Sequence, residues 1–150
     1  METTANRNTA ILMQLSAYTQ YFIPFGNFIF PTLIWSLKKQ DSKFVDYNGK
    51  QIINFQLSLF LYSLLLIIIA IPLLLYTTLS DLSFNTFNEF HFVHEQFSTE
   101  KITGIATIAI LAVVILIAMK VLEFFLIMYA SVRNSNGENY NYPLTIKFIK

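Results

Sequence analysis

The segment LSLFLYSLLLIIIAIPLLLYTTL, residues 57–79, decides the fold class of this chain. It contains no charged residue, and its apolar side chains surround the helix axis instead of forming one stripe, as in a helix surrounded by lipid. A bilayer core about 30 Å thick is crossed by roughly 20 apolar residues in a helix. We therefore predict that this segment spans a membrane.

Working outward, three runs lack Asp, Glu, Lys and Arg: residues 8–37, 51–80 and 102–119. Pro24, Gly26 and Pro31 divide the first run into two pieces that are each too short to span alone as a straight helix. The first run is therefore either one kinked span or a re-entrant helical hairpin, and we favour the hairpin because of the break at Pro24 to Asn27.

These runs predict an all-α integral membrane protein. Two long transmembrane helices form an antiparallel hairpin, and a Pro/Gly-broken helical element precedes them. The expected segments are a broken element (11–37), a cytoplasmic loop (38–50), a transmembrane helix (51–79), an outer loop with an interfacial helix (80–101), a second transmembrane helix (102–132) and a cytoplasmic tail (133–150).

Charge sets the expected orientation. Lysine and arginine are frequent in residues 38–50 and in the tail, whereas residues 80–101 are acidic. Short loops rich in Lys and Arg stay in the cytoplasm. We therefore predict a multi-pass protein of the bacterial cytoplasmic (inner) membrane, with residues 38–50 and the C-terminus inside and residues 80–101 outside. Residues 1–9 lack the features of a secretory signal, so Met1 is expected to be retained.

Composition excludes several classes of function. The chain has 150 residues, 13% of them charged, a net charge of +1 and no cysteine. A basic stripe for nucleic acid is missing, and a chain without thiols has no disulfide, thiolate metal site or Cys nucleophile. We find no phosphate-binding loop and no hydrolase motif such as HExxH or GxSxG. The sequence thus predicts a non-enzymatic protein with no cofactor and no metal.

The outer loop offers one metal hypothesis. Phe84, Phe87 and Phe90 recur at near-helical spacing, which favours an amphipathic helix in the headgroup region. His91 and His94, with Glu95 beside them, could ligate a metal from one helix face. We favour solvated polar residues on an interfacial helix instead.

Lys120 and Glu123 lie three residues apart, on one face of the last helix. Lys120 can be an interfacial anchor whose side chain reaches the headgroups. Alternatively, the two residues form a buried pair linked to a proton or substrate, or satisfy a polar partner in an assembly.

Polar residues gather where the second run enters the membrane: Asp46, Asn48, Lys50, Gln51, Asn54 and Gln56. Asn48-Gly49 suits a turn that needs a positive φ. The amides of Gln51, Asn54 and Gln56 can hydrogen-bond to opened backbone in the broken first segment.

The tail alternates apolar and polar residues from Tyr140 to Phe148, which predicts an extended segment with one apolar face. This segment would lie along the cytoplasmic headgroups or in the mouth of the helical bundle. Trp35 and the tyrosines fit an interfacial aromatic belt.

Three motifs carry a family resemblance: FPTLIW (30–35) leading into two lysines, FVDYNGKQ (44–51) continuing to NFQ (54–56), and NGENYNYPL (136–144). Their combination resembles the Tic-twenty-like family of small bacterial membrane proteins of unknown function. Members of that family are distant relatives of a component of the chloroplast inner-envelope import machinery. The match covers roughly residues 12–150. The resemblance implies a helical membrane protein tied to protein translocation or membrane assembly, without a defined reaction.

Two functions follow as hypotheses. The leading one is a non-enzymatic accessory subunit of a larger membrane assembly handling protein translocation or insertion. Its partners would be the lipid bilayer and either other membrane proteins, such as a translocase, or further copies of itself. The alternative is a homo-oligomeric channel or small transporter, with Lys120, Glu123 and the turn at Pro24 to Asn27 lining the route. The residues expected to make structural or partner contacts are Trp35, Asp46, Asn48, Gly49, Lys50, Gln51, Asn54, Gln56, Lys120, Glu123, Gly137, Tyr140, Tyr142 and Pro143.

Overall fold

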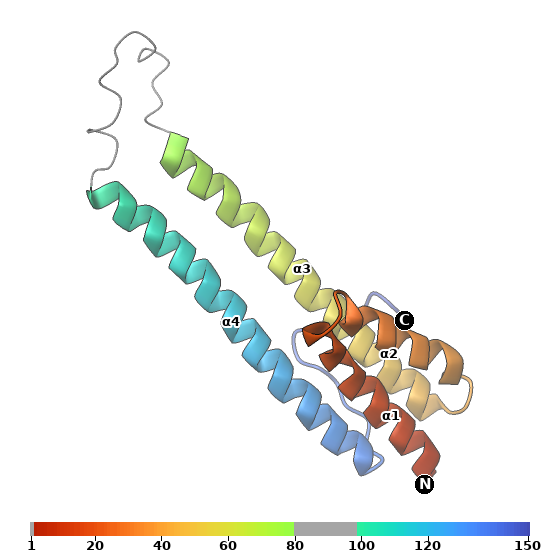
Figure 1. The fold of residues 1–150 in the computed structure, drawn as a ribbon. Helices are drawn as coiled ribbons and strands as arrows, with labels where there is room; N and C mark the ends of the chain where they lie inside the picture. Colours follow the sequence, from red (N-terminus) through yellow and green to blue (C-terminus); the bar gives the residue numbers. More distant parts are fainter. Residues whose placement is uncertain (1, 80–98) are drawn as a thin grey trace. The chain divides into compact units, whose positions relative to one another are not determined.

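A computed structural model describes residues 2–79 and 99–150 (Figure 1). The elements are α1 (Thr4–Ser16), a 3-10 helix η1 (Ala17–Tyr21), α2 (Gly26–Lys38), α3 (Lys43–Leu79) and α4 (Thr99–Ser135). These residues contain no strand, so the regular elements of the described part are all helical, as predicted. The predicted interfacial helix and the hypothetical ligands His91, His94 and Glu95 lie outside the described residues.

The chain divides into two compact units. The first comprises Met1–Leu61 and Met119–Lys150, and the second comprises Tyr62–Ala118. Helices α3 and α4 each contribute to both units. Among the described residues, all of the buried hydrophobic side chains lie in the first unit.

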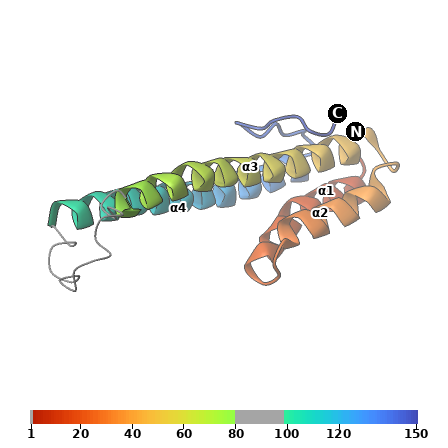
Figure 2. The same ribbon diagram turned by 90° about the horizontal axis from the view of Figure 1, so that it is seen from above.

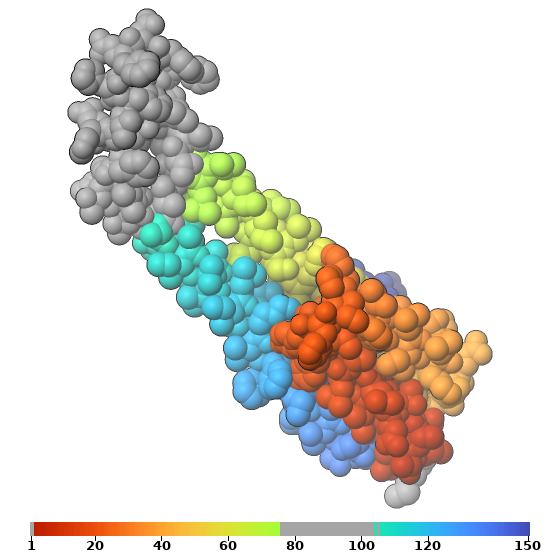
Figure 3. Space-filling model, in the orientation of Figure 1, coloured from red at the N-terminus to blue at the C-terminus, as the bar shows by residue number. Residues whose placement is uncertain are grey.

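The N-terminal break lies where Pro24 and Gly26 predicted it. The chain leaves η1 at Tyr21, and α2 begins at Gly26. Phe25 adopts a left-handed φ of 61°, and a Cβ on Gly26 would lie 2.5 Å from Thr19 Oγ1. Helices α1 and α2 pack against each other and cover one face of the first unit (Figures 1 and 3). The region is therefore a helical hairpin rather than one kinked helix.

Helix α3 begins eight residues before the predicted span. Residues 43–50, expected in a loop, are helical, because Ser42 Oγ accepts a hydrogen bond from the Val45 N–H at 3.1 Å and caps the helix. The turn predicted at Asn48-Gly49 is wrong. A Cβ on Gly49 would lie 2.2 Å from Trp35 Cδ1, so the glycine allows α2 and α3 to approach closely.

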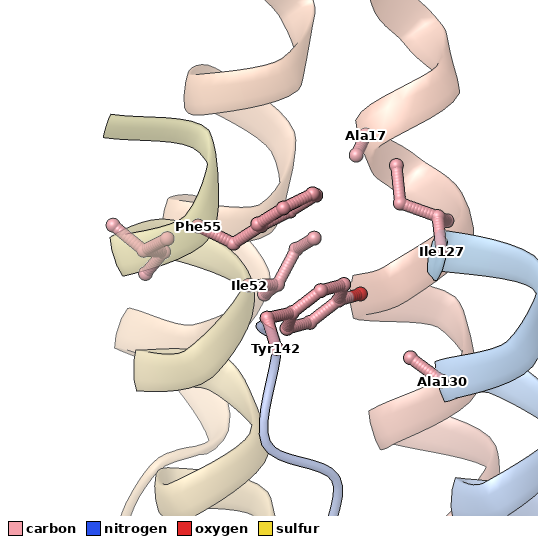
Figure 4. Packing of buried hydrophobic residues seen from close by; sticks show 7 residues of the cluster. Ala17, Ile52, Phe55, Ile127, Ala130 and Tyr142 are labelled. Atoms are coloured by element: carbon pink, nitrogen blue, oxygen red, sulfur yellow. The ribbon is translucent and has the colours of Figure 1, made fainter. Parts of the chain in front are cut away.

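The core of the first unit joins four parts of the chain (Figure 4). Its members include Ala17 of η1, Ile52 and Phe55 of α3, Ile127 of α4, and Tyr142 of the tail. The rings of Phe55 and Tyr142 stack with centroids 4.2 Å apart. Within this unit the tail lies on the side opposite α1 and α2 (Figure 2), and Tyr142 inserts between the helices.

The extended tail with one apolar face is not formed. Tyr142 is buried, but Leu144 is 79% exposed and Phe148 is also exposed. Leu144 takes a left-handed φ of 57°, which turns the chain and ends the alternation after Tyr142. Of the five apolar side chains expected on one face, only Tyr142 is therefore buried, while Tyr140 is half-buried.

Two helices are long and apolar enough to cross a membrane: Lys43–Leu75 and Ala106–Ser135. Only 6% and 11% of their most apolar windows are buried. In the second unit Ile68 and Ile69 of α3 and Ile110 and Leu111 of α4 are all exposed. A core helix of a soluble protein would bury such side chains, so these surfaces suit lipid.

Candidate functional site: a buried polar network

Asn134 is the centre of a buried amide network in the first unit. It is fully buried near the end of α4. Its Nδ2 group donates to Asn48 Oδ1 of α3 at 2.8 Å and to the Glu138 carbonyl at 3.0 Å. Its Oδ1 accepts from Gln14 Nε2 of α1 at 3.0 Å. One side chain thus links α1, α3, α4 and the start of the tail.

Asn48 ties the tail to α3. Its Oδ1 also accepts from the backbone N–H of Tyr140 at 3.1 Å, and its Nδ2 donates to Asn139 Oδ1 at 2.9 Å. Nδ2 also donates to the Phe44 carbonyl one turn earlier in α3. Fully buried amides are costly unless they are hydrogen-bonded, and Asn48 satisfies this requirement.

Tyr142 completes the network from the tail. Its hydroxyl donates to Gln14 Oε1 at 2.6 Å, so both polar atoms of the buried Gln14 amide have partners. Burial raises the pKa of Tyr142 well above its ordinary value, because the phenolate would lose its hydration. Partial burial of Tyr140 raises its pKa as well.

A second cluster surrounds Glu123, which is only 1% exposed on α4. Its Oε1 accepts from Gln20 Nε2 at 2.8 Å and from Gln56 Nε2 at 3.0 Å. Its Oε2 accepts from Lys120 Nζ at 2.8 Å. Asn27 extends the cluster into α2 by donating to Gln56 Oε1 at 2.7 Å.

Lys120 differs from its partner, because its side chain is 56% exposed. Its ammonium group also donates to Gln20 Oε1 at 2.9 Å. The pair is therefore neither a plain surface anchor nor fully buried. A buried carboxylate pairs with a lysine that is more than half exposed, and the roles expected for the pair from the sequence stay predictions.

Asp46 connects α2 to α3. It accepts from Trp35 Nε1 at 2.9 Å and pairs with Lys50 Nζ at 2.6 Å. The Trp35 ring lies against Gly49 one turn along. These four residues therefore form a packed joint between the two helices.

The sequence analysis predicted that amides of α3 hydrogen-bond to opened backbone in the first segment. They do not. Asn54 instead holds the tail: its Nδ2 donates to the Ile149 carbonyl at 2.9 Å, and its Oδ1 accepts from the Ile149 N–H at 2.8 Å. Gln56 hydrogen-bonds to the side chains of Asn27 and Glu123. The Gln51 side chain makes no hydrogen bond within the described part of the chain. The broken segment satisfies its own backbone through the turn at Thr19 to Gly26.

Gly137 and Pro143 have local roles. Gly137 adopts a φ of 78°, and its N–H donates to the Asn134 carbonyl while the Glu138 N–H donates to the Arg133 carbonyl. This pattern is a Schellman motif that ends α4 and requires a residue tolerant of positive φ. Pro143 is exposed directly after Tyr142.

The side chains of these clusters are mainly amides, with two carboxylates (Glu123 and Asp46), two ammonium groups (Lys120 and Lys50) and the phenol of Tyr142. Among the described residues, no three of His, Cys, Asp and Glu gather as a metal site would require. The polar groups mostly satisfy one another. The arrangement is suited to holding helices and tail together in a fixed packing.

Comparison with protein families gives a match over residues 5–149 to the model named MamF_MmsF, the magnetosome magnetite crystal formation protein family. The chain belongs to this family. No curated protein and no solved structure matches it significantly.

Membership of the MamF/MmsF family corrects the resemblance drawn from the sequence. The prediction of a Tic-twenty-like family is wrong, and with it the support for protein translocation is lost. The three motifs predicted the wrong family for a physical reason. FPTLIW, FVDYNGKQ and NGENYNYPL supply Trp35, Asp46, Asn48 and Tyr142, whose contacts maintain the fold and do not identify a transported substrate.

Several residues of the network in this MamF/MmsF member were missed at the sequence level. They are Gln14, Gln20 and Asn134, whereas Asn27 was expected only as part of the turn at Pro24 to Asn27. A signal was present, because Gln14, Gln20 and Asn27 are polar residues inside an otherwise apolar run. Polar residues in a membrane segment need a hydrogen-bond partner, so this pattern indicates a buried polar contact at each position.

Proposed function

We propose that this chain is a non-enzymatic, membrane-embedded accessory protein that acts in magnetite crystal formation at the magnetosome membrane. The observation that carries the proposal is the family match, which includes both candidate spans and all of the polar network. The mutual hydrogen bonding of the buried amides supports a structural role over a catalytic one.

In this proposal the two long helices cross the bilayer as an antiparallel hairpin. The lysine-rich connection before α3 and the tail lie on the cytoplasmic side, and residues 80–101 lie on the other side. The hairpin of α1 and α2 then forms a cap with the tail. Other membrane proteins, or further copies of the chain, would pack against the exposed apolar faces.

A complementation experiment tests the magnetosome role. The chain is expressed in a magnetosome-forming bacterium that lacks its own member of the family, and crystal size is measured by electron microscopy. We expect the chain in the magnetosome fraction and a shift of crystal size toward the parental value. Asn134→Ala, expressed at the same level, should restore less than Ser135→Ala. Crystals unchanged by a correctly localised wild-type chain would refute the role.

A second candidate, a homo-oligomeric channel or transporter, is favoured by one observation. A chain of hydrogen bonds leads from Asn27 through Gln56 to the buried Glu123 and the exposed Lys120. Ionisable groups on membrane helices often mark ion or proton pathways.

Flux into liposomes tests this candidate with the purified protein. Flux should appear with the wild-type chain and fall on Lys120→Leu or Glu123→Gln, whereas Lys38→Leu, an exposed lysine outside the cluster, should behave as wild type. No flux from a folded wild-type protein would eliminate the candidate.

A further inference from the structure

The tail and the start of α3 form a pocket of about 590 Å³ in the first unit. Four of the nine lining residues are lysines: Lys43 and Lys50 of α3, and Lys147 and Lys150 of the tail. Asp46 is the one carboxylate among the lining side chains. Four ammonium groups and one carboxylate leave a formal charge of +3, which attracts anions.

The pairing of these charges leaves three lysines for a ligand. Asp46 is occupied, because it pairs with Lys50 at 2.6 Å and accepts a hydrogen bond from Trp35. Lys43, Lys147 and Lys150 have no carboxylate partner within the described ranges, and all three are exposed. Like charges held close together repel one another unless an anion or solvent screens them.

The tail lysines are held in place by hydrogen bonds. Asn54 makes two hydrogen bonds with the backbone of Ile149, which directly precedes Lys150 in the tail. Ser58 Oγ accepts from the Ile146 N–H at 2.8 Å and fixes the other side of Lys147. Side chains of α3 therefore bring lysines nearly a hundred residues apart in sequence to one pocket.

Gln51 supplies an independent observation. It lines the pocket, is only 8% exposed, and makes no hydrogen bond in residues 2–79 or 99–150. Its amide atoms are not among the fully buried polar atoms that lack a partner, so they are accessible from the pocket that the residue lines. An anion in the pocket would give the Gln51 amide an acceptor for its N–H groups.

We propose that this pocket binds a phosphate-bearing anion through Lys43, Lys147, Lys150 and Gln51. Its volume is within the range of small-molecule sites and exceeds what a single inorganic phosphate needs. The candidate span of α3 begins at Lys43, so in a membrane the pocket lies at headgroup level. Basic pockets at the cytoplasmic ends of membrane helices bind phosphorylated headgroups in this way. The phosphate can therefore come from an acidic phospholipid or from a soluble phosphate compound.

The single tryptophan, Trp35, reports on the pocket through its hydrogen bond to Asp46. Its fluorescence is followed for the purified full chain in two arms. In one, pyrophosphate is added to the protein in neutral detergent micelles. In the other, the protein is reconstituted into phosphatidylcholine vesicles with or without phosphatidic acid. A response to pyrophosphate assigns a soluble ligand, and a response to phosphatidic acid alone assigns the lipid; either supports the pocket.

Variants decide whether the response comes from the pocket. Lys147→Gln should weaken binding about fivefold to tenfold, as for loss of one charge-assisted hydrogen bond. Gln51→Leu should also weaken it, whereas Lys38→Gln, an equal change of charge outside the pocket, should not. Absence of any response, or equal effects of Lys147→Gln and Lys38→Gln, would overturn the proposal. None of these readouts depends on crystal formation, so failure here leaves the magnetosome role intact.

Discussion

Gly49 and Gly104 both lie inside long helices, yet their surroundings are opposite. A Cβ on Gly49 would lie 2.2 Å from Trp35, whereas a Cβ on Gly104 would meet nothing within 4 Å. Because the Trp35 ring is also held by Asp46, it has little freedom to move away. Position 49 therefore requires glycine because the Trp35 ring packs against its Cα, and not because the backbone there needs the conformational freedom of glycine.

Gly49→Ala should therefore destabilise the first unit by about 1–3 kcal/mol, the usual cost of overpacking. Unfolding in detergent, followed by the fluorescence of Trp35, measures the effect. Gly104→Ala is the matched control and should leave the free energy of unfolding unchanged or slightly raised, since alanine favours helices. Equal effects of the two changes would contradict the packing role.

Tyr142 makes a prediction about alkaline pH. Its pKa is raised in the folded protein by burial, so the folded state holds its proton more tightly than the unfolded state. The associated stability is fully present below the unfolded pKa of about 10 and is lost as pH rises through the folded value. The free energy of unfolding should therefore fall above about pH 10.

Tyr142→Phe separates this effect from packing. The ring can still stack on Phe55, but the buried Gln14 Oε1 loses its donor, at a cost of about 1–3 kcal/mol near neutral pH. Above about pH 10 the variant should lose less stability than wild type, with a smaller decline remaining from Tyr140. Parallel pH profiles for the two proteins would show that Tyr142 is not the titrating group.

At the scale of elements, Asn134 joins three helices and the tail through short hydrogen bonds. Removing its side chain would leave the buried Gln14 Nε2 without its acceptor and would take away one of the two donors to Asn48 Oδ1. A buried polar group left unpaired costs more than the hydrogen bond it made.

Asn134→Ala should accordingly lower the free energy of unfolding by about 2–4 kcal/mol, measured by denaturant titration in micelles. Ser135→Ala, an exposed neighbour whose hydroxyl bonds only to the Val132 carbonyl, should change it little. The network would lose its structural importance if both variants unfolded alike.

The sequence predicted the elements that depend on local pattern. The two long apolar helices follow from composition alone, and the N-terminal break follows from Pro24 and Gly26, which limit backbone conformation nearby. The start of α3 was missed because lysines and Asn48-Gly49 resembled a loop. The cap from Ser42 and the contact with Trp35 keep that region helical.

The polar network could be predicted only in part. Asn48, Asn54, Gln56 and Glu123 stood out as polar residues near or within apolar runs, but of their partners only Lys120, which pairs with Glu123, was predicted. The pairing of Gln14 with Asn134 joins residues 120 positions apart, which no local pattern encodes. The prediction for the tail was wrong for a similar reason, because its backbone bonds to Ser58 and Asn54 of α3, which are about 90 residues away in sequence.

At the scale of the whole molecule, the distribution of charge and apolar surface predicts how the chain sits in a bilayer. Because the chain has no cysteine, single-cysteine variants give a clean test. In the cytoplasmic membrane of a host without magnetosomes, a membrane-impermeant maleimide should label Ser83→Cys in intact cells. It should label Gln40→Cys only after permeabilisation. The reverse pattern would invert the proposed topology.

Tyr142 also has a consequence for biogenesis. It is synthesised after every helix that it touches. Gln14 is the first residue of the network to leave the ribosome, and its Oε1 has no hydrogen-bond donor until Tyr142 has been made. Nascent chains interrupted before residue 142 would contain helix amides whose hydrogen-bond partners in the tail are missing. Such products are suitable targets for membrane proteases, so late docking of one aromatic ring would distinguish finished from unfinished copies.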